Sequence, residues 1–76
     1  MKAKVEREEL VKAVRDYLEA NGGWVESVKF KQFLRRFGYK PSYVKYVISD
    51  LRVEGIIEVF RSPSGLWVVR LPKENV

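Results

Sequence analysis

The feature that most constrains the fold of this chain is a pair of amphipathic segments separated by only three residues. In the first segment the apolar residues recur at i, i+3, i+4 and i+7, one face of a helix, at Phe30, Phe33, Leu34 and Phe37. In the second they again have helical spacing, at Val44, Val47, Ile48 and Leu51. Gly38 is well placed to end the first helix, and Pro41 is favoured in the first turn of the second. Two short helices joined so closely predict a helix-turn-helix.

The ends of these helices carry recognisable signals. Ser27 is a candidate N-cap for the first helix, and Ser42 competes with Pro41 for the start of the second. Gly55 is the residue expected to stop that second helix. The sequence therefore predicts one helix between Ser27 and Gly38 and another over 41–54, with a connection over 38–40.

Another amphipathic segment precedes these two. Its apolar residues recur at helical spacing, at Leu10, Val11, Val14, Tyr17 and Leu18. Glu6, Glu8 and Glu9 fall in the first turns, where carboxylates interact favourably with the helix dipole. Asn21-Gly22 tolerates the left-handed backbone that commonly ends a helix. These residues predict a helix over 6–20.

After Gly55 the pattern changes from helical to extended. IIEVF (56–60) and LWVVRL (66–71) are rich in β-branched and aromatic residues, and they flank RSPSG (61–65), a turn-forming cluster. Pro72 ends the second run. The chain therefore ends in a β-hairpin, and Trp24-Val25 is long enough only for one rung of sheet. We expect an α+β fold of three helices, a short strand and a C-terminal hairpin.

Seventy-six residues are expected to make one domain, 1–76, with an ordered core over about 6–71 and a short polar C-terminal tail. The chain has no cysteine, so its stability must come from packing rather than from disulfides or thiolate zinc sites. The large aromatic residues are expected in the core, although the strand that carries Trp67 is expected to be partly exposed. They are Trp24, Phe30, Phe33, Phe37 and Trp67.

Positive charge is concentrated in one folded segment. Between Ser27 and Ser49 there is no acid, and the six basic residues are Lys29, Lys31, Arg35, Arg36, Lys40 and Lys45. In the first twenty residues, by contrast, five basic side chains are balanced by five acidic ones. A folded segment that concentrates basic residues on one surface is typical of a protein that binds polyanions. The alternative is an ordinary solvated, lysine-rich surface.

The order helix, short strand, helix, helix, hairpin resembles the winged-helix (winged helix-turn-helix) family of DNA-binding domains. The most specific part is SYVKYVISDLRVEGIIEV (42–59), which looks like the family's recognition helix running into its first wing strand. The matching positions are Ser42, Val44, Ile48, Leu51, Gly55 and Ile56-Ile57. Small archaeal and viral transcription regulators contain similar domains, as do replication proteins and a small-subunit ribosomal protein. The abundance of Lys, Arg and Glu, with no Cys and one Met, would also suit a hyperthermophile.

The resemblance implies a double-stranded DNA-binding protein that regulates transcription. Helix 41–54 would enter the major groove, and the wing loop 61–65 would reach the adjacent backbone or minor groove. The helix positions not needed by the core are the candidate contacts: Ser42, Tyr43, Lys45, Tyr46, Ser49 and Arg52. Lys45, Ser49 and Arg52 lie at i, i+4 and i+7, on a single stripe. Either tyrosine has the alternative role of completing the edge of the core.

Further candidate contacts lie in the wing and on the preceding helix. Arg61 leads the loop, with Ser62 and Ser64 assisting through hydroxyl or backbone N–H groups; the alternative for Arg61 is a solvated turn residue. The candidates for phosphate contacts lie on the helix that precedes the recognition helix and in the turn between the two helices. They are Lys29, Lys31, Arg35, Arg36 and Lys40. Four of these belong to one short helix and cannot all point the same way, so we expect two of the four to reach phosphate.

Other functions remain open at this point. One is an RNA- or ribosome-associated winged helix, and another is a protein–protein contact in a replication or transcription assembly. A membrane-surface role for KFKQFLRRF (29–37) conflicts with the use of its apolar face in the core, and no apolar run approaches the roughly 20 residues of a membrane span. Without histidine or cysteine, we expect no enzyme, no metal site, no cofactor and no small-molecule substrate. A domain this small would read a short half-site, so a homodimer on a palindromic DNA site is also a possible arrangement. The expected location is the cytoplasm, in association with the nucleoid.

Overall fold

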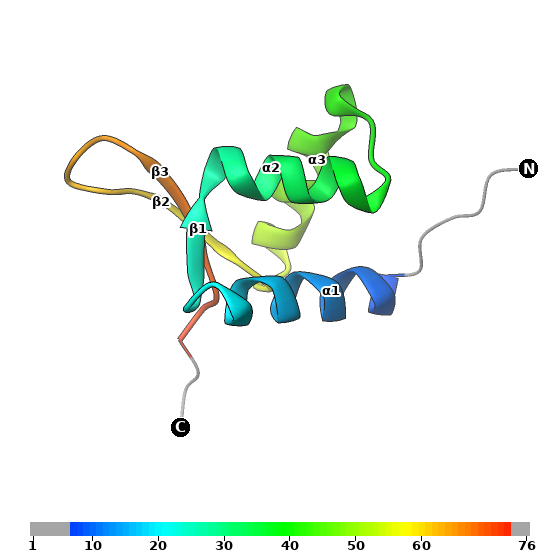
Figure 1. Ribbon diagram of the computed structural model, residues 1–76, viewed down its shortest axis with the longest axis horizontal. Coiled ribbons are helices and arrows are strands. Elements are labelled where there is room, and N and C mark those ends of the chain that lie inside the picture. Colours follow the sequence, from blue (N-terminus) through cyan, green and yellow to red (C-terminus); the bar gives the residue numbers. More distant parts are fainter. Residues whose placement is uncertain (1–6, 74–76) are drawn as a thin grey trace, which may run out of the picture.

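The computed structural model describes residues 7–73. Its elements, in chain order, are α1 (Arg7–Ala20), β1 (Trp24–Glu26), α2 (Ser27–Phe37), α3 (Pro41–Val53), β2 (Glu58–Arg61) and β3 (Trp67–Arg70) (Figure 1). The predicted α+β arrangement of three helices, a short strand and a C-terminal hairpin is confirmed. The expected helix start at Glu6 and the end of the polar tail, residues 74–76, lie outside the described residues.

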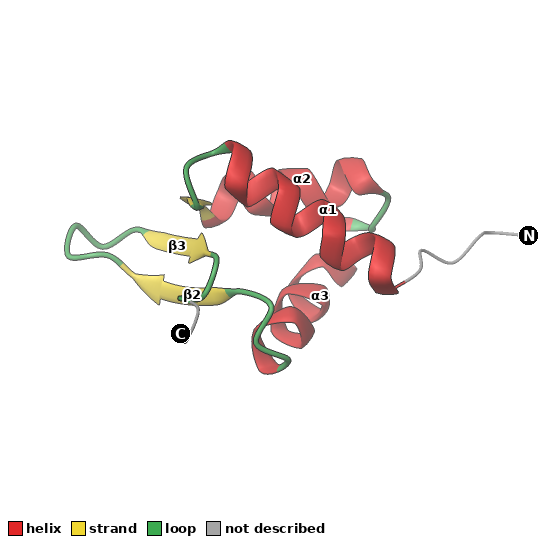
Figure 2. Ribbon diagram, turned by 90° about the horizontal axis from the view of Figure 1, so that it is seen from below, coloured by secondary structure: helices red, strands yellow, loops and turns green. Residues whose placement is uncertain are grey.

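The strands form an antiparallel sheet in the order β1-β3-β2. Val69 at the centre of β3 is opposite Val25 on one side and Val59 on the other. All three belong to the core or pack against it, so this face of the sheet is the one that the helices cover. Figure 2 shows the hairpin extending beyond the helices, with β2 on the side of α3.

Each helix contributes its apolar stripe to the core. The core residues are Leu10, Val14 and Leu18 from α1, Phe30 and Leu34 from α2, Val44, Val47 and Leu51 from α3, and Val25, Ile57 and Val69 from the sheet side. Phe30 is fully buried, and the half-buried Phe33 stacks on Tyr17 with ring centroids 4.3 Å apart. The helical spacing in the sequence therefore identified the buried faces of all three helices.

The expectation that Trp24 and Trp67 belong to the core was wrong. Trp24 is 53% exposed and Trp67 is 52% exposed. Successive side chains of a strand point to opposite faces, so Trp24 faces away from the helices because its neighbour Val25 faces them. Trp67 has the same orientation as Val69, but it pairs with Arg61 at the end of the sheet nearest the hairpin loop and stays half exposed.

Several element boundaries also differ from those predicted. Glu26, rather than Ser27, occupies the N-cap of α2, because β1 runs directly into the helix and leaves no loop residue between them. At the start of α3 the N-cap is Lys40 and Pro41 is in the first turn as predicted, so Ser42 is not the cap. The helix ends at Val53, one residue before the predicted end.

The hairpin differs from the prediction at its first strand. Pairing begins at Glu58 rather than at Ile56, because Ile57 is buried in the core instead of joining the ladder. Arg61 belongs to β2, where it is opposite Trp67. The connecting loop therefore runs over 62–66 rather than 61–65, and it keeps the predicted length of five residues.

The short connection between α2 and α3 depends on Gly38, whose φ of 128° is rarely adopted by residues with a side chain. The N–H groups of Gly38 and Tyr39 both donate to the Leu34 carbonyl, which ends α2. We expect Gly38→Ala to lower the free energy of unfolding by about 1–2 kcal/mol. Urea denaturation measures this change, with Gln32→Ala, on the exposed side of α2, as the control. Equal stability of the two variants would show that the turn tolerates a Cβ.

Candidate nucleic-acid interface

Helices α2 and α3 position ten of the fourteen predicted contact residues, and the turn between them and the hairpin position the other four. Of the fourteen, Ser62 is half-buried and all the others are exposed. On α3, burial of Val44, Val47 and Leu51 leaves the opposite side to solvent. The residues there are Ser42, Tyr43, Lys45, Tyr46, Ser49 and Arg52, as predicted. Val53, which sequence reasoning did not select, is 82% exposed one turn beyond Ser49, and the same helical spacing could have identified it.

Neither tyrosine of α3 completes the core. Tyr43 and Tyr46 are 55% and 56% exposed, with their ring centroids 6.0 Å apart. Tyr43 also stacks on Tyr39 at 6.1 Å, and the Lys45 Nζ lies 5.3 Å from the centroid of the Tyr46 ring. These contacts hold two hydroxyl groups and an ammonium group at the surface of the same helix.

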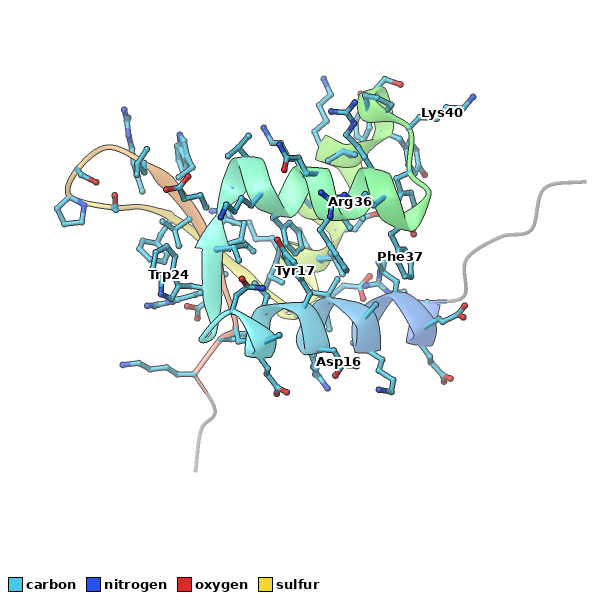
Figure 3. All side chains as sticks on the ribbon, in the orientation of Figure 1. Asp16, Tyr17, Trp24, Arg36, Phe37 and Lys40 are labelled. Carbon is cyan, nitrogen blue, oxygen red and sulfur yellow. The ribbon has the colours of Figure 1, made fainter. Side chains whose placement is uncertain are left out.

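The four basic residues of α2 divide between two sides of the helix. Lys31 and Arg35 are four residues apart and share one side, whereas Lys29 and Arg36, seven apart, share another. Tyr17 of α1 stacks on Phe33 and its hydroxyl donates to the Lys29 carbonyl at 3.4 Å, so α1 packs nearer the second side. In Figure 3, Arg36 projects from α2 and Lys40 projects from the turn that follows.

An open groove joins the end of α2 to the start of α3. Its lining residues are Gln32, Arg35, Arg36, Tyr39 and Pro41. The N-cap residue of α3, Lys40, makes no side-chain capping bond. Helix N-termini attract phosphate groups through their unpaired N–H groups, and the two arginines add positive charge beside this one. Gln32 and Tyr39 were not predicted, because their place in the groove depends on how the two helices pack.

Partial burial raises the pKa of the Tyr39 hydroxyl above its ordinary value of 10.0, and the nearby charge of Arg7 opposes that rise. Tyr39 is therefore neutral at physiological pH and offers the groove a hydrogen-bonding hydroxyl rather than a charge. On α1, a hydrogen bond to Asp16 raises the pKa of Lys12. Lys12 thus stays charged beside a neutralising carboxylate.

The basic residues of α2, the turn and α3 are not neutralised by nearby acids. Within residues 7–73, the ion pairs are Arg7–Glu54, Lys12–Asp16 and Arg70–Glu58. None of them includes a residue of the acid-free segment 27–49. The positive charge of that segment is therefore available to a partner.

The loop of the hairpin is held in one shape by its own hydrogen bonds. The Gly65 N–H donates to the Ser62 carbonyl at 2.8 Å, and the Ser62 N–H donates to the Leu66 carbonyl at 2.7 Å. Gly65 has φ 93°, so this is a turn with Pro63 and Ser64 at its centre followed by a left-handed glycine. The Ser62 hydroxyl accepts from the Leu66 N–H and lies 2.9 Å from the Ser64 hydroxyl. Both hydroxyls thus have partners within the loop.

Arg61 lies at the base of this loop with its guanidinium group partly fixed. Its Nε donates to the Gly65 carbonyl at 3.3 Å, and its guanidinium carbon lies 5.9 Å from the centroid of the Trp67 ring. These contacts leave the terminal nitrogens of the exposed side chain to reach outward. Arg52 of α3 lies beside β2, in a groove that Glu58 and Val59 also line.

In the part of the chain that the structure describes, no group of three or more His, Cys, Asp or Glu residues is placed to hold a metal ion. Over the same residues, no helix is both long enough and apolar enough to cross a membrane. Comparison with known proteins adds no relative, because no family model, no curated protein and no solved structure matches this chain.

Proposed function

We propose that this chain is a single winged-helix domain that binds double-stranded DNA and regulates transcription. Helix α3 would enter the major groove, with Lys45, Ser49 and Arg52 towards the bases. Arg35, Arg36 and Lys40 would contact phosphates, and Arg61 at the hairpin loop would reach the adjacent backbone or minor groove. The observation that carries the proposal is the exposed basic surface of α2, the turn and α3, whose charges have no acidic partner among residues 7–73.

Three features of the surface support DNA as the polyanion. The exposed side of α3 combines a lysine and an arginine with serine and tyrosine hydroxyls, which are groups that donate to base edges and phosphates. The start of this helix opens onto a groove lined by two arginines. The hairpin extends beyond the helices and carries a partly fixed arginine at its loop.

The test is selection from a random-sequence duplex DNA pool at physiological salt, with the double variant Lys45→Ala/Arg61→Ala beside the unchanged protein. We expect the unchanged protein to enrich a defined motif and the variant to bind that motif about 10- to 100-fold more weakly, because a base contact and a backbone contact are both lost. Fluorescence anisotropy on the selected sequence measures the affinities.

The matched control is Lys12→Ala/Arg15→Ala, which likewise removes one lysine and one arginine, here from exposed positions of α1. We expect this control to bind with nearly unchanged affinity. Equal losses in the two double variants would show that net charge, and not α3 with the hairpin, governs binding. Strong binding without a motif would indicate a protein that coats DNA, and binding to structured RNA in preference to duplex DNA would contradict the proposal.

A further inference from the structure

The face of the sheet that points away from the helices is unusually apolar. Its side chains alternate with the core-facing ones along each strand. The apolar members are Trp24, Phe60, Leu66 and Val68, which together line a groove of about 480 Å³. Val68 is only 5% exposed although it faces away from the helices and lies outside the hydrophobic cluster that they cover, so its neighbours on this face already shield it from water. Figure 3 shows Trp24 projecting from β1 on the side away from the helices.

Charge distinguishes this outer face from the rest of the molecule. It carries two carboxylates, Glu26 and Glu58, and one guanidinium group, that of Arg70, in a chain whose net charge is +5. The Arg70 Nε donates to Glu58 at 2.8 Å, and the guanidinium carbon lies 4.7 Å from the centroid of the Phe60 ring. A second basic copy of the chain can therefore approach this face without meeting the basic cluster, and a polyanion is not attracted to it.

The strand register makes the outer face complementary to itself. Across the three strands, Trp24, Arg70 and Glu58 form one row of the outer face. Glu26, Val68 and Phe60 form the next row of the same face. A two-fold axis can lie in the plane of contact between two such sheets and run diagonally over Trp24 and Val68. Rotation about this axis places Glu26 of one copy over Arg70 of the other. It also places Phe60 of one copy over Leu66 of the other. With ordinary strand spacing, the strands of two sheets related in this way cross at roughly 70°, closer to the orthogonal than to the aligned packing of sheet on sheet.

We propose that two copies of this chain associate through their outer sheet faces about this two-fold axis. The exposed Trp24 side chains of the two copies meet at the centre beside the shielded Val68, Phe60 of one copy packs on Leu66 of the other, and Glu26 pairs with Arg70 at the rim. Such an interface is isologous, as in most homodimers. The helices cover the opposite face of each sheet, so the basic surfaces of both copies stay exposed on the outside of the dimer.

Sedimentation equilibrium without nucleic acid tests this proposal independently of DNA binding. We expect the mass to rise with protein concentration from 8.9 kDa to twice that value. Trp24→Glu should raise the dissociation constant of the dimer by about 30-fold or more, because it removes a central aromatic residue and buries two carboxylates. The matched control is Trp67→Glu, an equally exposed tryptophan on the other face, which should leave the dimer unchanged.

Charge exchange tests the pairing itself. Glu26→Arg places two positive charges at each rim contact and Arg70→Glu places two negative ones, so each variant alone should dimerise more weakly than the unchanged protein. An equimolar mixture of the two should restore dimers, because every rim contact is again between opposite charges. Circular dichroism verifies that each variant is folded. A protein that is monomeric at all concentrations, a dimer that Trp24→Glu leaves intact, or a mixture that does not associate would overturn the proposal.

Discussion

Raising the salt concentration from about 50 mM to about 200 mM should weaken binding to duplex DNA by roughly a thousandfold. A protein that neutralises about six phosphates releases as many counterions, which gives a log–log salt slope of about −5 to −6. The basic residues of α2, the turn and α3 are exposed, as is Arg61 of the hairpin, and those of segment 27–49 have no acidic partner among residues 7–73. The full entropic gain of counterion release is therefore available to the complex.

The slope also assigns the phosphate contacts to particular residues. The double variant Arg35→Ala/Arg36→Ala should reduce the magnitude of the log–log salt slope by about two, because each lost phosphate contact lowers that magnitude by about one. The α1 variant Lys12→Ala/Arg15→Ala should keep the original slope, because Lys12 and Arg15 lie outside the proposed interface. Lys12 is in addition paired with Asp16. Titrations by fluorescence anisotropy at several salt concentrations give these values. A slope near −1, or an absence of binding at low salt, would contradict the proposed function.

The elements of the fold could be predicted from sequence because their signals are local. Apolar residues at helical spacing identified the buried sides of three helices, since that spacing alone decides which residues share a face. Gly38 and Pro41 marked the short connection between α2 and α3 because each residue has backbone limits that do not depend on the rest of the chain. The exposed side of α3 followed from its buried side by elimination.

The parts that could not be predicted depend on contacts distant in sequence. Alternation along β1 separates Trp24 from Val25, but it does not say which face of the sheet the helices cover. Glu26 became the cap of α2 because β1 pairs with β3 up to that residue. The place of Tyr39 beside Arg35 and Arg36 requires the packing angle of two helices. Local patterns therefore predicted which candidate residues are exposed, but not which of them lie together.

Replacing Phe30 with alanine should cost about 3–5 kcal/mol of folding free energy. Phe30 is the largest fully buried side chain, and it contacts the rings of Tyr17 and Phe33 with centroids 6.4 and 6.0 Å away. A domain of this size has about 4–11 kcal/mol of stability in total, so the loss is a large fraction of it. We expect the melting temperature, followed by circular dichroism, to fall by more than about 12 °C.

Two control variants separate the loss of packing from the loss of an aromatic ring. Phe30→Leu keeps most of the volume and should cost less than about 1.5 kcal/mol. Trp67→Ala removes a larger ring from a half-exposed position outside the core, so it should also cost much less than Phe30→Ala. Similar losses for Phe30→Ala and Trp67→Ala would show that Phe30 is not at the centre of the core.

Duplex DNA should restore part of the stability that Phe30→Ala removes. A ligand that binds only the folded state adds about 2.7 kcal/mol when its free concentration is 100 times the dissociation constant. Phe30 itself is fully buried and cannot touch the DNA, so the variant keeps the whole proposed interface once it is folded. Its melting temperature should therefore rise with DNA concentration, and the rise should be smaller at high salt. No rise at a saturating DNA concentration would mean that binding does not require the folded arrangement of α2, α3 and the hairpin.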